Sequence, residues 1–159
     1  MTESGGDSSG VRIFPPVIAA LGIIVGLVLE WRWPLPIVAE GTRPPLRLGG
    51  FFLVAVWLLL AISAVVTFRR AGTTPNPTKP TTALAFGGPY RFTRNPMYLG
   101  LLLLVVGLAL VMNSVWLVIM SVPVLLLLRQ AVILKEERYL EGKFGDDYLA
   151  YKKRVRRWI

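Results

Sequence analysis

The sequence predicts an all-α integral membrane protein with about four transmembrane helices and a C-terminal cytoplasmic amphipathic helix. Of its 159 residues, 54% are hydrophobic, and the mean hydropathy is +0.58. Several apolar runs are long enough to cross a bilayer and hold few charges. Cysteine and histidine are both absent, and only nine residues are acidic. We therefore expect no disulfide, thiolate nucleophile, histidine base or metal site.

The N-terminal part predicts a short tail followed by a two-helix membrane anchor. Residues 1–12 are small and polar, which is typical of a disordered tail. Ile13–Leu29 is the first apolar run, and Leu48–Phe68 is the second. The second run holds about 20 residues, which as a helix is about 30 Å long. The anchor therefore covers residues 13–68.

A long loop and a helical hairpin come next. Residues 71–96 show no helical period, and such a loop in a small protein is usually functional or disordered. The loop contains an apolar patch, Ala83–Phe86, which we expect to pack onto the protein or dip into the membrane interface. Met97–Met112 and Val115–Leu134 are the third and fourth spans. Because only a tight turn joins them, they form an antiparallel hairpin.

The tail after the fourth span is charged. The helix is expected to continue through about Glu141, because no helix breaker occurs before Gly142. Asp146 is placed to cap a last helix, Asp147–Arg157, which is basic and amphipathic and suits a membrane surface.

The distribution of basic residues predicts the orientation in the membrane. Three Lys or Arg residues lie in the 30–47 loop, five in the 69–96 loop and nine in the tail from residue 129. By the positive-inside rule, the second loop and both termini are cytoplasmic. The net charge of +9 indicates anionic membrane lipids rather than nucleic acid as partners, because the basic residues flank apolar spans.

Polar and turn-forming residues gather in the stretch Gly87–Gly100. Asn95 is a good helix N-cap, and Pro96 suits the first helical position. One interpretation is simply a capped third span with arginines that anchor it. The other is that Arg91 and Arg94 join the free N–H groups of the helix start in binding a carboxylate or phosphate.

A second group of polar residues follows the fourth span. Glu136 and Glu137 point about 100° apart on a helix, so that Glu137 shares a face with Gln130 and Glu136 shares one with Arg129. They fit either a solvated helix end or a carboxylate site for a cationic ligand group. Arg129 lies inside the apolar run, where it either snorkels to the interface or marks a functional site.

The hairpin brings these two groups together at the cytoplasmic side. The expected result is a pocket with donors for an anion, a carboxylate for a cation and aromatic walls. A zwitterionic cofactor with an adenine ring and a sulfonium would match it.

Two sequence blocks carry a family resemblance. Gly-Pro-Tyr-Arg-Phe-Thr-Arg-Asn-Pro-Met-Tyr-Leu-Gly is followed, after two spans, by Glu-Glu-Arg-Tyr-Leu-Glu-Gly-Lys-Phe-Gly-Asp-Asp-Tyr-Leu-Ala-Tyr. This pair resembles the integral-membrane methyltransferases, which include isoprenylcysteine carboxyl methyltransferases and phospholipid N-methyltransferases. The resemblance covers roughly residues 65–159, implies that residues 69–159 form the catalytic region, and implies S-adenosylmethionine as cofactor.

The resemblance also implies site residues. The cofactor-binding residues are expected to be Tyr90, Arg91, Asn95, Tyr98, Leu99, Glu136, Glu137, Tyr148 and Tyr151. The expected catalytic residues are Arg94 and Arg129, which would orient a carboxylate acceptor, and Glu137, which would assist an amine acceptor.

We therefore expect an S-adenosylmethionine-dependent methyltransferase that acts on a lipid-like or amphipathic acceptor at the cytoplasmic interface. A carboxylate acceptor, as in the isoprenylcysteine branch, is the first candidate and a phospholipid amine the alternative. The isoprenylcysteine branch usually has His at the position of Asn95. The sequence Asn-Pro-Met-Tyr is instead similar to the phospholipid branch. The Gly-x-Gly cofactor motif of the phospholipid branch, however, has no counterpart here. A non-catalytic lipid-binding membrane module is the second alternative. In a bacterium the location would be the plasma or inner membrane, and the sequence assigns no oligomeric state.

Overall fold

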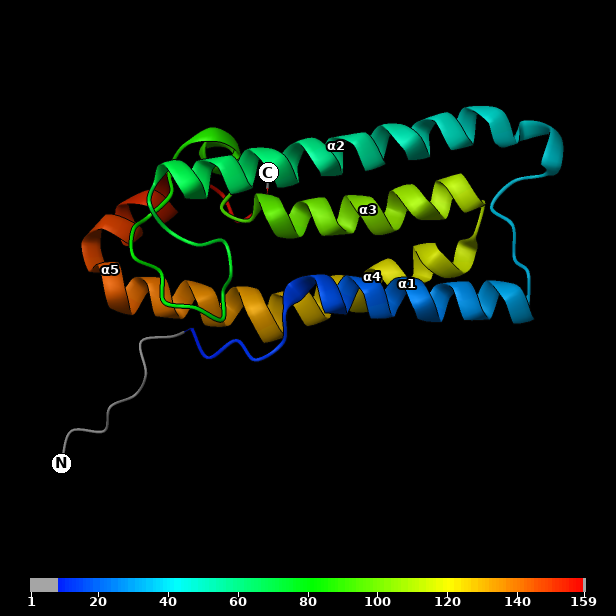
Figure 1. The fold of residues 1–159 in the computed structure, drawn as a ribbon. Coiled ribbons are helices and arrows are strands. Elements are labelled where there is room, and N and C mark those ends of the chain that lie inside the picture. Colours follow the sequence, from blue (N-terminus) through cyan, green and yellow to red (C-terminus); the bar gives the residue numbers. More distant parts are fainter. Residues whose placement is uncertain (1–8, 159) are drawn as a thin grey trace.

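The chain folds into long helices that lie side by side (Figure 1). The computed structural model describes residues 9–158. Its main helices are α1 (Pro15–Arg32), α2 (Arg43–Arg70), α3 (Pro96–Met112), α4 (Val115–Leu127) and α5 (Leu134–Arg154). The shorter helical segments are η1 (Glu40–Thr42), η2 (Gly88–Arg91) and the π-helical η3 (Leu128–Ile133). Since residues 9–158 contain no strand, the all-α prediction is confirmed.

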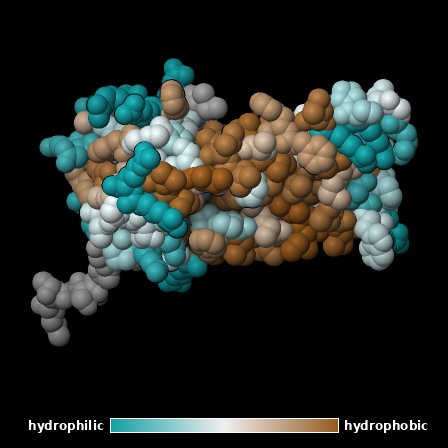
Figure 2. Space-filling model, turned by 45° about the horizontal axis from the view of Figure 1, so that its top comes forward, coloured by the Kyte–Doolittle hydropathy of each residue, from teal (hydrophilic) through white to brown (hydrophobic). Residues whose placement is uncertain are grey.

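Three helical segments are long and apolar enough to cross a membrane. They are Pro15–Arg32, Glu40–Arg70 and the continuous run Val115–Arg154, while Pro96–Met112 is a shorter apolar helix. Figure 2 shows a broad hydrophobic band between two hydrophilic ends. Large apolar side chains stay exposed along this band, for example Phe52 at 65% and Leu59 at 67%. This surface is suited to lipid contact.

Helix α2 begins five residues before the predicted second span. Its first turn contains Pro44 and Pro45. Proline is tolerated there because the first N–H groups of a helix have no intrahelical partner. The polar segment before Leu48 is therefore part of the helix rather than of the preceding loop.

Close packing between helices depends on small residues. Helix α2 packs on α3, and α1 packs on α4. A Cβ atom at Gly50 would lie 2.7 Å from the carbonyl oxygen of Gly107, and one at Gly26 would lie 2.6 Å from the Leu117 side chain. Glycine at these positions lets the helix backbones approach closely, as at many membrane helix interfaces.

The turn between α3 and α4 fixes one end of the bundle. Asn113 has φ +58°, and its side-chain oxygen accepts hydrogen bonds from the amides of Ile37 (3.1 Å) and Val38 (3.0 Å). The Ser114 hydroxyl donates to Glu30 over 2.6 Å. The loop after α1 is thus tied to the hairpin turn.

The opposite end contains the polar stretch and the charged tail. Helix α4 passes through η3 into α5 without a break. Gln130 and Glu137, which were expected to share a face, differ in exposure: Glu137 is buried at 5% exposure, while Gln130 is exposed. A π-helical segment carries more residues per turn than an α-helix, and this changes which residues share a face.

The tail differs from its prediction in two details. The helix breaks at Gly145, with φ +50° and ψ −125°, and not at Gly142. A side chain strongly disfavours that conformation, which explains glycine at the break. The last helical turn ends at Arg154, three residues before the predicted end.

The segment before α1 also differs from the predicted tail. Residues 1–8 of that prediction lie outside the described residues. Ser9 and Val11 are buried, and the Ser9 hydroxyl donates to the Pro77 carbonyl. Val11 joins a core cluster with Tyr98 and Leu101, so its apolar side chain holds this segment against the bundle.

Candidate functional site

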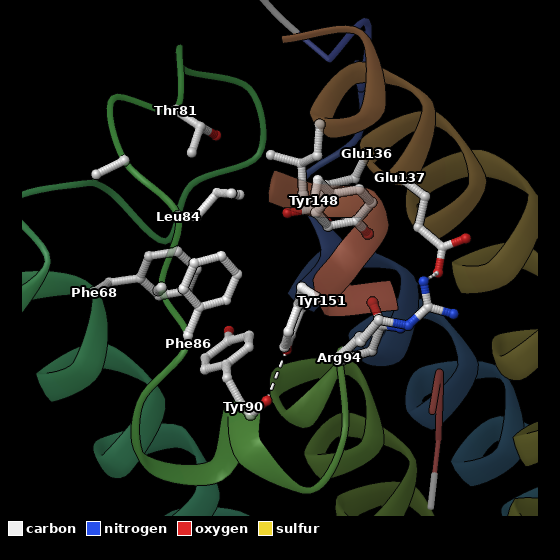
Figure 3. Close-up of a pocket in the computed structure, with 14 residues that line it drawn as sticks. Phe68, Thr81, Leu84, Phe86, Tyr90, Arg94, Glu136, Glu137, Tyr148 and Tyr151 are labelled. Carbon is white, nitrogen blue, oxygen red and sulfur yellow. Dashed lines mark hydrogen bonds and ion pairs between the residues drawn. The ribbon is translucent and has the colours of Figure 1, made fainter. Parts of the chain in front are cut away.

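A pocket lies at the end of the bundle where the loop before α3 meets α5. It contains about 510 Å³ of empty space, including the part that is open to solvent. Figure 3 shows loop residues on one side, and Arg94, Glu136 and Glu137 on the other. We call it the polar pocket, and its lining residues are Phe68, Thr81, Ala83, Leu84, Ala85, Phe86, Tyr90, Arg94, Asn95, Glu136, Glu137, Leu140, Tyr148 and Tyr151.

Five aromatic rings form one wall of the polar pocket. The ring centroids of Phe68 and Tyr90 are 5.3 Å apart, edge to face, and those of Phe86 and Tyr151 are 4.8 Å apart. Tyr148 lies 6.0 Å from Tyr151, whose hydroxyl donates to the Tyr90 carbonyl over 2.7 Å. Such a wall is suited to a flat ring or to a cation.

The tyrosines of this wall are held in the neutral form. Burial raises the pKa of Tyr151 to about 12, although Arg94 opposes the shift. Burial also raises the pKa of Tyr90 and Tyr148 above the usual value, and the nearby carboxylates add to both shifts. At neutral pH these phenols therefore act as hydrogen-bond groups rather than as bases.

Glu137 lies between two arginines. Its oxygens accept hydrogen bonds from Arg157 Nε (3.0 Å) and Nη2 (2.7 Å). Arg94 Nη1 is 3.4 Å from Glu137 Oε1, and the Arg94 and Glu137 side chains are only 8% and 7% exposed. The hydrogen bonds with Glu137 raise the pKa of Arg157. This ion-pair group is the most buried charge cluster of the polar pocket.

Arg94 has buried donors that form no hydrogen bond within the described part of the chain, although Nη1 belongs to the ion pair with Glu137. Its Nε and Nη1 atoms are buried and have no hydrogen-bond partner among the described residues. Buried donors without a hydrogen-bond partner are rare in proteins because they are costly. Where one occurs, a ligand or a water molecule often supplies the acceptor. Arg94 is therefore ready to receive an anion.

Asn95 does not cap α3 with its side chain, although α3 begins directly after it at Pro96. Asn95 therefore occupies the predicted N-cap position, but its side chain makes no capping hydrogen bond. Its Nδ2 donates over 3.1 Å to the carbonyl of Arg157, which also accepts from the Thr93 hydroxyl over 2.9 Å. Asn95 thus connects the polar stretch to the C-terminal end.

Glu136 makes a different contact from its neighbour, as expected for adjacent residues on a helix. The Tyr98 hydroxyl donates to Glu136 Oε2 over 2.6 Å. Burial raises the pKa of the Glu136 carboxyl, the hydrogen bond from Tyr98 opposes that shift, and the charge of Glu137 adds to it. Glu136 comes two residues after the end of the apolar run at Leu134.

Tyr98 also belongs to a second, apolar cavity. We call it the apolar groove; it contains about 810 Å³ of empty space, including open volume, between α1, α2 and α3. Its lining residues include Phe14, Ala19, Ile23, Trp57, Met97, Tyr98 and Leu104. Since Tyr98 lines this groove and its hydroxyl reaches Glu136, one side chain connects the two cavities.

Not every predicted site residue reaches the polar pocket. Tyr90, Arg94, Asn95, Glu136, Glu137, Tyr148 and Tyr151 line it. Arg91 is exposed and lines a separate groove with Arg70. Leu99 and Arg129 are not among the lining residues, and Arg129 is exposed on η3. Leu99 follows Tyr98 on a helix and so points about 100° away from it.

Sequence reasoning missed several residues of this site. Phe68 ends an apolar run, and Arg157 is one of many basic residues in the tail, so neither had a distinguishing signal. Leu84 and Phe86 carry a signal in the sequence, because they belong to an apolar patch in an otherwise polar loop, which predicts packing onto the protein. Both residues line the polar pocket.

Comparison with known proteins gives two matches. The family model for phospholipid methyltransferase matches residues 46–147, almost two thirds of the chain. An uncharacterized protein of Haemophilus influenzae is 43% identical over 65 residues, which is 40% of this chain and the whole of that protein. No solved structure matches. The matched segment includes Tyr90, Arg94, Asn95, Glu136 and Glu137, and it shows that the chain belongs to the phospholipid methyltransferase family.

Proposed function

We propose that this protein is an S-adenosylmethionine-dependent methyltransferase that crosses the membrane four times, with both termini cytoplasmic. It transfers a methyl group to a lipid-like acceptor at the cytoplasmic interface. The observation that carries this proposal is that Arg94, in an aromatic-walled pocket, has buried N–H groups at Nε and Nη1 that form no hydrogen bond within residues 9–158. The family match supports the reaction class.

The residues of the polar pocket fit the groups of the cofactor. S-adenosylmethionine, when bound, supplies a methyl group on a sulfonium and carries a carboxylate, an ammonium and an adenine ring. We assign the carboxylate to Arg94, whose Nε and Nη1 groups form no hydrogen bond with the described residues. Glu136 lines the same pocket and has one oxygen held by Tyr98, so it is the partner we assign to the ammonium.

The aromatic wall suits the remaining parts of the cofactor. Phe86, Tyr148 and Tyr151 offer ring faces for the adenine and for the positive sulfonium. Glu137 takes a different role from the one expected, because Arg157 occupies both of its oxygens. We assign it to holding the arginines rather than to touching the substrate.

The apolar groove is our proposed site for the acceptor's hydrocarbon chain. Tyr98 and Glu136 mark where the groove approaches the polar pocket, which would place the acceptor headgroup near the cofactor. Methyl transfer needs no metal or thiol; the protein must align donor and acceptor and exclude water. The family match favours a phospholipid amine as acceptor over the carboxylate that sequence reasoning placed first.

One experiment tests both the activity and the acceptor class. Membranes containing the protein are incubated with methyl-labelled S-adenosylmethionine, and labelled lipid amines are separated from base-labile methyl esters. Label in the lipid amines supports the proposal, and label in base-labile esters identifies a carboxyl acceptor instead. If purified protein binds neither S-adenosylmethionine nor S-adenosylhomocysteine by calorimetry, the enzyme proposal fails and the chain is a lipid-binding module.

A further inference from the structure

The chain returns to the polar pocket after α5. We call residues Val155–Trp158 the C-terminal strap. The amide of Arg94 donates to the Arg156 carbonyl over 3.0 Å. Thr93 and Asn95 donate to the Arg157 carbonyl over 2.9 and 3.1 Å. The strap is thus fixed along its backbone to the segment that carries Arg94.

Side chains of the strap hold it on two further sides. Trp158 packs against the hydrophobic core cluster. Arg157 binds Glu137 through two hydrogen bonds, the geometry in which a guanidinium holds a carboxylate most strongly. Arg157 is 29% exposed, whereas Glu137 is 7% exposed. The strap therefore supplies the main partner of a buried carboxylate.

The position of Arg94 gives this contact a consequence for ligand binding. Arg94 Nη1 lies 3.4 Å from Glu137 Oε1, close enough for an ion pair but with no hydrogen bond formed. Arg157 already donates to each of the two oxygens of Glu137. Without Arg157, Glu137 would be a buried carboxylate whose nearest cation is Arg94, and a strong hydrogen-bonded pair between them would be favoured.

We propose that Arg157 is a positioning residue: by engaging Glu137, it keeps the Arg94 donors available for the carboxylate of a bound ligand. This inference rests on the function proposed above. Arg157 lies ten residues beyond the end of the family match at residue 147, so the match does not assign it a role. Within the strap, it is the Arg157 side chain that then contributes to ligand binding.

The test compares two neighbouring arginines. In full-length protein in detergent, Arg157→Gln is expected to weaken binding of S-adenosylhomocysteine by about tenfold, measured by calorimetry. Arg156→Gln removes the same charge from an exposed side chain next to it and keeps the backbone carbonyl. We expect it to bind as the wild type does. Arg157→Lys keeps the charge but cannot form the two-point contact, so its loss should be smaller than that of Arg157→Gln.

A second pair of variants separates positioning from a purely structural role. If Arg157 acts by restraining Glu137, neutralising Glu137 removes the competitor for Arg94. The double variant Glu137→Gln/Arg157→Gln should then bind more tightly than Arg157→Gln and within about twofold of Glu137→Gln alone, a non-additive result. The double variant leaves no unpaired buried carboxylate. It can therefore still be measured if Arg157→Gln alone fails to fold.

Each outcome decides the question. If wild-type protein binds and Arg157→Gln binds equally well, the inference is overturned. It is also overturned if adding Arg157→Gln to Glu137→Gln costs a further tenfold, because the strap would then act without Glu137. If the wild type itself binds no S-adenosylhomocysteine, it is the proposed function that fails.

Discussion

Arg94 is the residue on which cofactor binding should depend most directly. Its Nε and Nη1 atoms are buried in the polar pocket and form no hydrogen bond with the described residues. A hydrogen bond to a charged group contributes roughly 1.5–3 kcal/mol, so Arg94→Gln should raise the dissociation constant of S-adenosylhomocysteine by about tenfold or more. Arg91→Gln is the matched control, because Arg91 is exposed and lines a different groove. Equal losses in the two variants would contradict the assignment.

Glu136 should give cofactor binding a dependence on pH. Burial raises its pKa above the usual value of 4.5, so the carboxyl takes up a proton at a higher pH than an exposed glutamate does. Only the ionised form pairs with an ammonium, so affinity for S-adenosylhomocysteine should fall as the pH drops through this raised pKa. Glu136→Gln should bind more weakly at neutral pH and lose this dependence. Calorimetry over a pH series measures both, and an unchanged pH profile in the variant would refute the role.

Tyr151 should contribute to alkaline instability. Its pKa is raised from 10.0 to about 12, so the folded protein keeps a proton that the unfolded chain loses. The stability that this neutral phenol provides is complete below pH 10 and is lost as the pH rises toward 12. Tyr151→Phe should lose about 1 kcal/mol at neutral pH, through the hydrogen bond to Tyr90, and show a smaller alkaline decrease. Thermal unfolding in detergent at several pH values tests this, and a decrease as steep as in the wild type would contradict it.

At the scale of elements, the contact between α2 and α3 depends on the absence of side chains. A Cβ atom at Gly50 would lie 2.7 Å from backbone atoms of Gly107 and Val111, so that one of the helices must shift. Gly50→Ala should therefore lower the free energy of unfolding by about 1–3 kcal/mol.

The neighbouring Gly49 is the control for that prediction. A Cβ atom there meets nothing within 4 Å, so Gly49→Ala should be neutral, or stabilising by about 0.5 kcal/mol through helix propensity. Thermal melts of both variants in the same detergent make the comparison. If the two variants have the same melting temperature, the prediction that Gly50 is needed for close packing of α2 on α3 is contradicted.

The passage from α4 to α5 shows how far helical periodicity predicts the site. The helical period correctly predicts that Glu136 and Glu137 face different neighbours. Tyr98 donates to Glu136, and Arg157 donates to Glu137. Across the π-helical η3 the helical period does not account for the different exposure of Glu137, which is buried, and Gln130, which is exposed. A regular period of 3.6 cannot anticipate a π-helical segment, because tertiary packing decides where the extra residue is accommodated.

For the whole molecule, orientation in the membrane can be tested with introduced cysteines, because the chain has none. Gly41 and Asp147 are both exposed, and α2, α3 and α4 lie between them. If all three helices cross, an impermeant maleimide should label Gly41→Cys in intact cells and Asp147→Cys only after permeabilisation. Labelling of both from one side would mean that the short helix α3 does not cross.

The helical class, the hairpin and the two polar blocks of the polar pocket can all be predicted from the sequence. Apolar run length and turn chemistry are local properties, and the tight turn after α3 places residues near 94 beside residues near 137. These features needed no knowledge of packing.

The pairing of the polar groups, in contrast, depends on how the helices and the C-terminal strap pack together. Asn95 lies at the predicted N-cap position of α3, but its side chain makes no capping hydrogen bond, and its Nδ2 donates to the Arg157 carbonyl of the returning strap. Arg129 and Arg157 are the same residue type in the same basic tail, yet one is exposed on η3 and the other holds a buried carboxylate. The physical reason is that the energy of a polar pair depends on its burial and on the position of a partner far away in the chain. A local sequence pattern predicts neither the burial nor the partner's position.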